Sequence, residues 1–195
     1  MVAIKYSVAA ALLSSSVMAA PVASVTVPEL HTSTALVKLL RDSANSIANG
    51  LFHLTSLTVN HEVDNVENFT SIFEELLKDV GVVVPGLDGI VNLGDNALSS
   101  ILVPGINVVV NLSVQVINGL LDGIGQTIPK KLEDNVLYKF LELLQTGRGI
   151  VTGLGGNLTK LNVPAASQLN DLLPKIDSAT NATKMCKDKK VCNGW

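Results

Sequence analysis

The stretch from Val84 to Ile128 constrains the fold more than any other part of the chain, because it is apolar and nearly uncharged. No lysine or arginine occurs between Lys78 and Lys130, and the acidic residues between those two lysines are Asp79, Asp88, Asp95 and Asp122. Burial of apolar surface contributes about 25 cal/mol per Å², so such a segment is unfavourable when it is left in water. It must be buried inside its own fold, against a ligand or against an apolar surface.

Two related segments lie in this stretch. Val-Pro-Gly-Leu-Asp-Gly-Ile-Val-Asn-Leu starts at Val84, and Val-Pro-Gly-Ile-Asn-Val-Val-Val-Asn-Leu starts 19 residues later at Val103. Proline is tolerated in the first turn of a helix, so Pro85 and Pro104 each predict a helix start, and the first of these helices is expected to extend to Leu102. In the second copy, alternating valines also fit a β-strand. We prefer the helix there, because its period extends over more of the segment.

Before this repeat, apolar residues at spacings of three and four predict two amphipathic helices. The first begins near Thr32 or Ser33 and carries the stripe Leu36, Leu40, Ala44, Ile47, Leu51 and Leu54. The second follows Asp64, which forms a capping-box pattern with Glu67, and it ends near Asp79.

After the repeat, the same spacing predicts a helix over Lys130–Thr146, with Gly147 as its stop. The glycine-rich segment Gly149–Leu161 keeps apolar residues at helical spacing, and a short helix is expected between Pro164 and Pro174. The fold class that these patterns predict is all-α. We expect an antiparallel bundle of about six helices, with the two repeat helices as its apolar central pair.

The N-terminus has the parts of a secretory signal peptide: a cation at Lys5, the apolar run Val8–Leu13 and small residues at the exit. The apolar run is shorter than the roughly 20 residues that span a bilayer. We therefore predict a signal peptide over residues 1–20, a single helical domain over 21–177, and a loose, basic tail over 178–195. The protein is expected to be secreted, to the extracellular space or the cell wall.

Secretion gives two further sequence features a meaning. Cys186 and Cys192 are the cysteines of the chain, and in an oxidising compartment they predict one disulfide that closes a small loop. Four Asn-x-Ser/Thr sequons mark candidate N-glycan sites, which would lie at the surface: Asn68, Asn111, Asn157 and Asn181. Asn181, in the polar tail, is the strongest candidate, and Asn111, in the apolar stretch, is the weakest.

The chain offers few groups for catalysis. Its histidines are His31, His53 and His61. They form no HExxH zinc motif, and the glycine-rich segments lack the Lys-Ser/Thr of a phosphate loop. The phenylalanines of the predicted helical domain are Phe52, Phe69, Phe73 and Phe140, and all of them fall on predicted core stripes. Tyr138 is the aromatic residue left for the surface. We predict a protein that is not an enzyme and has no catalytic residues, cofactor or metal site. The net charge of −3 argues against nucleic acid, and the asparagines of the apolar stretch argue against a membrane span.

The repeat region instead indicates binding. Its glycines leave space beside the helices, so the apolar side chains there could line a cavity for a lipid, open onto an apolar surface, or pack as ordinary core. The residues of this candidate apolar-ligand site are Leu87, Ile90, Val91, Ile106, Val109, Val110, Ile117 and Leu121.

The N-terminal segment, the Ala-Pro-Val-Ala-Ser that starts at Ala20, the sequons and the aromatic-poor body resemble small secreted fungal proteins of the cell-wall mannoprotein and hydrophobic-surface-binding type. The resemblance implies a helical, glycosylated protein associated with walls or apolar ligands, and it assigns no functional residue. We expect a secreted, non-catalytic protein that binds a lipid or a hydrophobic or cell-wall surface, with wall polysaccharide or protein as partner. The alternative is an interaction protein without a small-molecule ligand, an effector or a wall component, which uses the basic tail or an exposed helix face.

Overall fold

The structure is a computed structural model that describes residues 27–59, 66–93, 96–128 and 132–192. The predicted signal peptide, Asp64 and His61 lie outside these residues. Every regular element within them is helical, so the all-α prediction is confirmed and the strand alternative for the second repeat is wrong. In chain order the helices are α2 (Val27–Val59), α3 (Val66–Gly81), α4 (Val83–Leu93), α5 (Asn96–Thr127), α6 (Asp134–Lys160), α7 (Ala166–Asn170) and α8 (Leu173–Lys189).

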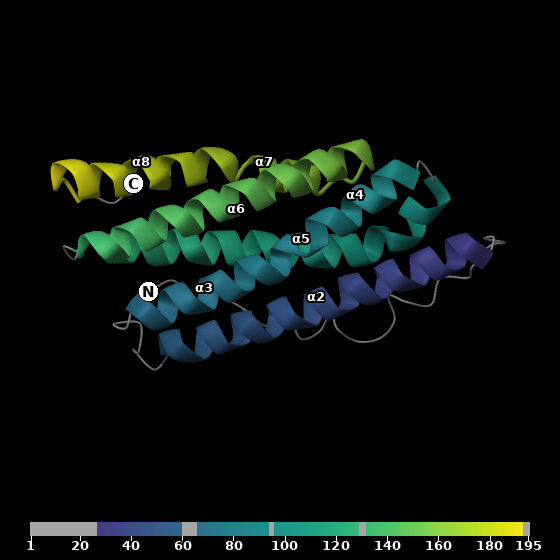
Figure 1. The fold of residues 1–195 in the computed structure, drawn as a ribbon, viewed down its shortest axis with the longest axis horizontal. Coiled ribbons are helices and arrows are strands. Elements are labelled where there is room, and N and C mark those ends of the chain that lie inside the picture. The colour runs from purple at the N-terminus through teal and green to yellow at the C-terminus, as the bar shows by residue number, and fades with distance from the viewer. Residues whose placement is uncertain (1–26, 60–65, 94–95, 129–131, 193–195) are drawn as a thin grey trace.

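The helices run back and forth along one long axis and form an antiparallel bundle (Figure 1). α3 and α4 follow one another as a bent rod that returns beside α2, and α7 and α8 return beside α6. α5 packs against α2, α3, α6, α7 and α8, and α6 packs against α3, α4, α5, α7 and α8, so these two helices are the central elements. α4 packs mainly against α6, α2 and α3 rather than against α5. The prediction that the two repeat helices form a packed central pair is therefore wrong.

The bend between α3 and α4 follows from a proline. The amide of Val82 still donates a hydrogen bond to the carbonyl of Lys78, at 3.1 Å. Pro85 has no N–H to donate to the carbonyl of Gly81, so the helical ladder is interrupted at this turn. Pro85 consequently falls in the first turn of α4, as predicted.

The second proline behaves differently. Pro104 lies inside α5, which already begins at Asn96, so the prediction that Pro104 starts a helix is wrong. The first repeat helix also ends at Leu93 instead of extending to Leu102. An interior proline costs a helix about 3 kcal/mol, and here the burial of Leu102 and Ile106 on either side of it offsets that cost.

Glycines are likewise accommodated within α6. The helix continues through Gly147 to Lys160, so Gly147 is not the predicted stop. A Cβ atom built on Gly147 would lie 3.0 Å from Cδ1 of Ile117, and one on Gly153 would lie 2.8 Å from Cγ1 of Val84. Close contact with α5 and α4 thus outweighs the intrinsic penalty of roughly 1 kcal/mol for each helical glycine.

The C-terminal segment is the largest departure from expectation. Residues 178–189 belong to α8, whose first turn contains Pro174, so both the predicted loose tail and the predicted helix end at Pro174 are wrong. The buried side chains of α8 recur at spacings of three and four, which is the pattern of a helix packed on one face: Ile176, Ala179, Thr183 and Cys186. Two of the four are small and one is polar, so the stripe is inconspicuous in the sequence.

Candidate functional site

The residues predicted to bind an apolar ligand are core residues. Seven of the eight are at most 4% exposed, and Val91 is partly buried. The seven belong to one continuous cluster that also includes residues of α2, α3, α6, α7 and α8. The structure therefore brings these side chains into the core of the bundle, where the neighbouring helices cover them.

The space beside two of the glycines in the repeat region is filled by side chains. A Cβ atom built on Gly86 would lie 2.6 Å from Cδ2 of Leu39, and the corresponding position on Gly123 is overlapped by the ring of Phe69. Real Cβ atoms do not approach other atoms so closely, so each glycine is a point at which a neighbouring helix comes into contact. Gly86 and Gly123 therefore leave no room for a ligand, whereas a Cβ atom on Gly89 would meet nothing within 4 Å.

The repeat has a structural role that the sequence did not reveal. Gly86, in its first copy, contacts Leu39, and Gly105, in its second copy, faces Cδ1 of Leu40 at 3.4 Å. Leu39 and Leu40 are neighbours in α2. Both Val-Pro-Gly segments thus let their helices, α4 and α5, approach the same turn of α2.

Asn157 is a buried polar contact between α6 and α4. Its side chain is 3% exposed, and its Nδ2 atom donates a hydrogen bond to the carbonyl of Val84 at 3.2 Å. An N-glycan on that nitrogen would require the two helices to separate, so the burial conflicts with the glycan predicted at Asn157. The other three sequon asparagines are exposed: Asn68, Asn111 and Asn181.

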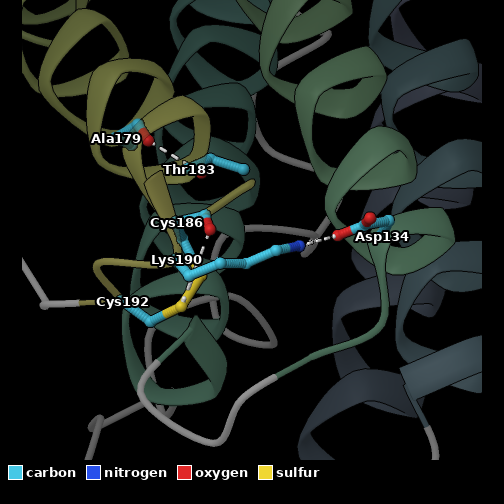
Figure 2. The surroundings of a disulfide bond; sticks show 6 residues. All are labelled: Asp134, Ala179, Thr183, Cys186, Lys190 and Cys192. Atoms are coloured by element: carbon cyan, nitrogen blue, oxygen red, sulfur yellow. Dashed lines mark hydrogen bonds and ion pairs between the residues drawn. A yellow bond between two sulfur atoms is a disulfide. The ribbon is translucent and has the colours of Figure 1, made fainter. Parts of the chain in front are cut away.

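The C-terminal end of α8 is fastened to the start of α6 (Figure 2). A disulfide joins Cys186 and Cys192, as the sequence predicts. Between them, Lys190 adopts a left-handed backbone conformation with φ of 56° and ends the helix. Its Nζ atom lies 2.7 Å from a carboxylate oxygen of Asp134.

Two further polar contacts hold α8 on α6. The guanidinium of Arg148 lies 2.8 Å from Asp177, and this hydrogen bond and charge raise the pKa of Arg148. The ammonium of Lys187 lies 4.2 Å from the ring centroid of Tyr138, and its contact with Tyr138 raises the pKa of Lys187. These basic residues, together with Lys190, are therefore engaged within the chain.

Several large apolar side chains remain exposed. Phe52 is 78% exposed and Tyr138 is 56% exposed, and Met185 and Val191 are also exposed. Tyr138, Met185 and Val191 belong to the end where α8 finishes and α6 begins, which we call the disulfide end: the amide of Val191 donates to the carbonyl of Met185, and Lys187 of α8 lies over the ring of Tyr138. Phe52 is on α2, which lies across the bundle from α8 (Figure 1). The prediction that Phe52 is a core residue is wrong, because Phe52 follows the buried stripe residue Leu51 by one position and so points away from the core.

A groove lies between α2 and α3. Its volume is about 410 Å³, within the range of about 300–1,000 Å³ of small-molecule sites. The side chains that line it are His53, Asn68, Ser71, Ile72 and Glu75. It is a mixed polar and apolar surface rather than the apolar cavity that the sequence suggested.

Groups suited to chemistry are sparse. In the described ranges, no three His, Cys, Asp or Glu side chains come together in a way that could hold a metal ion. Every buried side-chain nitrogen and oxygen there has a hydrogen-bond partner. Of the predicted histidines, His53 lines the groove, whereas His61 and the side chain of His31 lie outside the description.

The apolar character of α5 also meets a simple membrane criterion. Residues Leu102–Thr127 are long and apolar enough to cross a bilayer by length and composition, with a mean hydropathy of 1.4. Half of the most apolar window is buried inside the bundle. The core helix of a bundle meets the same criterion, and the position of α5 among five other helices fits that explanation.

Comparison with protein-family models, with curated proteins and with solved structures found no match to this chain.

Proposed function

We propose that this chain is a secreted, non-catalytic protein that attaches through its disulfide end to a hydrophobic or cell-wall surface. The observation that carries the proposal is that Tyr138, Met185 and Val191 are exposed together at the disulfide end. Burial of one large apolar side chain contributes about 1.5–3 kcal/mol. A few such contacts are enough for reversible attachment.

The packing of the core favours a surface over an enclosed lipid. Ile106, Val109 and Ile117 are each 1% exposed, and the gaps at the glycines are occupied by Leu39 and Phe69. An acyl chain could reach these residues only if α2 or α3 moved away from α5. Attachment through the exposed Tyr138 and Met185 requires no such opening.

An adsorption assay with paired variants tests the proposal. Unglycosylated protein is passed over alkyl-coated beads and over wall-glucan particles, and the retained fraction is titrated against bead area. We expect the double variant Tyr138→Ser and Met185→Ser to bind about tenfold or more weakly than the wild type, since about 1.4 kcal/mol corresponds to a factor of ten. Equal retention of the double variant and the wild type on the beads and particles would contradict the proposal.

A matched control is available in Val82. This side chain is 46% exposed but lies at the bend between α3 and α4, away from the disulfide end. Val82→Ser should therefore leave adsorption unchanged. Loss of adsorption in this variant as well would indicate general surface hydrophobicity rather than a particular end of the molecule.

Mass spectrometry distinguishes the enclosed-lipid alternative from the proposed surface attachment. Native mass spectrometry of the secreted protein, followed by organic extraction, should give the mass of the polypeptide and its glycans alone. A bound lipid-sized mass that is lost on extraction would restore the core residues around Val109 as a ligand site and would contradict the packing argument.

A further inference from the structure

Asn68 combines two features that no other sequon residue shares. It is the exposed acceptor asparagine of an Asn-Phe-Thr sequon, and its side chain lines the groove between α2 and α3. We propose that Asn68 carries an N-linked glycan and that the innermost sugar of this glycan lies in the groove. The inference rests on the secretion included in the proposed function, and it assigns to the groove an occupant that is covalently attached to the chain.

The lining of the groove fits a sugar. Asn68, Ser71, Ile72 and Glu75 follow one another at helical spacing along a single face of α3, and His53 faces them from α2. The Ser71 hydroxyl and the Glu75 carboxylate can exchange hydrogen bonds with sugar hydroxyl and acetamido groups. Ile72, which is partly buried, offers an apolar surface to the C–H face of the ring.

The remaining sequons provide an internal comparison. Asn157 is buried and bonded to Val84, so a chain with a glycan on that nitrogen could not form the contact between α6 and α4, and the folded protein should lack it. Asn111 and Asn181 are exposed, but neither is among the residues that line this groove. A glycan at Asn111 or Asn181 would therefore not lie in this groove.

The chemistry of attachment also indicates its timing. The amide nitrogen of Asn68 displaces a lipid-linked diphosphate from C1 of an oligosaccharide donor, so that one C–N bond forms, one C–O bond breaks and one proton leaves the nitrogen. The donor is supplied by the secretory pathway. In the folded chain Thr70 is 1% exposed and its hydroxyl donates to the carbonyl of Glu67 at 3.0 Å. The sequon hydroxyl is therefore unavailable to a transferase after folding, and attachment precedes formation of α3.

The test uses the full chain behind a host leader in a glycosylating yeast, so that its outcome does not depend on residues 1–20. Glycopeptide mapping should find Asn68 occupied and Asn157 unoccupied. In a variant with Asn111→Gln and Asn181→Gln, an endoglycosidase then leaves one sugar on Asn68, and an amidase removes the whole glycan. We expect the melting temperature to remain unchanged when the glycan is trimmed to one sugar, and to fall by about 3 °C when the whole glycan is removed. A shift of this size is usual for the loss of one modest contact in a chain of this length.

A variant that keeps only Asn111, made by Asn68→Gln and Asn181→Gln, is the matched control. Its melting temperature should be the same after trimming and after complete removal, to within about 1 °C. An unmodified Asn68, or an equal fall in the control, overturns the proposal. Because the adsorption assay is performed on unglycosylated protein, failure here is distinguishable from failure of the proposed surface attachment.

Discussion

Replacement of the α6 glycines by alanine tests the idea that some glycines mark helix contacts. Gly149 and Gly153 lie one turn apart on α6. A Cβ atom at Gly153 would lie 2.8 Å from Cγ1 of Val84, whereas one at Gly149 would meet nothing within 4 Å. The two substitutions are therefore chemically identical and differ only in what the added methyl group meets.

The magnitudes can be worked from these distances. Alanine is favoured over glycine in a helix by roughly 1 kcal/mol, so Gly149→Ala should stabilise the protein by about 0.5–1 kcal/mol. Gly153→Ala gains the same term but forces a methyl group against a β-branched side chain that has little rotamer freedom. Overpacking of this kind costs about 1–3 kcal/mol. Gly153→Ala should therefore be less stable than Gly149→Ala by about 1–3 kcal/mol.

Thermal and urea unfolding of the two variants measure this difference. For a chain of this size about 1 kcal/mol moves the melting temperature by about 2–4 °C. Adding Val84→Ala should restore most of the stability that Gly153→Ala loses, with a coupling energy of about 0.5–3 kcal/mol. Gly156→Ala, also in open space, should behave like Gly149→Ala. Equal stability of the Gly149 and Gly153 variants would refute the assignment of Gly153 as a contact between α6 and α4.

Three other outcomes follow from the packing. Gly123→Ala should destabilise the bundle by about 1–3 kcal/mol in urea unfolding, because the ring of Phe69 occupies the Cβ position and is held by Phe73 at 4.7 Å; a neutral result would contradict it. Asn157→Ala should cost about 0.5–1.5 kcal/mol by removing a buried hydrogen bond to the Val84 carbonyl, whereas the exposed Asn111→Ala should stay within about 0.5 kcal/mol of the wild type. Replacing both cysteines by serine should cost at most about 2 kcal/mol, given the short loop, and hydrogen exchange should accelerate in the last turn of α8 but not in α5.

The fold class could be predicted because the apolar stripes of α2 and α3 are regular and their polar faces are clear. Helix ends were harder to predict where intrinsic preference and packing disagree. Gly147 and Pro104 are helix-ending residues by propensity, yet each is surrounded by apolar contacts that offset its cost. These contacts involve residues of other helices, so a local pattern does not contain them.

The candidate site was harder to predict for a related reason. An apolar residue such as Val109 has the same sequence appearance whether it faces a lipid or another helix, and only the neighbouring helices decide between the two. Asn157 illustrates the opposite error, because a sequon indicates surface exposure although this asparagine bridges α6 and α4. The groove at Asn68 combines residues of two helices, and the spacing within α3 was the one part of it visible in the sequence.

The nearly uncharged stretch is the most distinctive feature of the sequence, and the central position of α5 accounts for it. Between Leu102 and Ile128 the exposed residues are proline or polar: Pro104, Asn111, Asp122 and Gln126. Every other position there is buried or partly buried, so the helix has few positions at which a charge would be solvated, and Asp122 occupies one of them. Burial thus accounts for most of the uncharged character of this stretch, and neither a bilayer nor an enclosed ligand is needed to explain it. What the core does not explain are the apolar side chains left exposed at the disulfide end and the polar groove beside Asn68, and these are the surfaces where function should be sought.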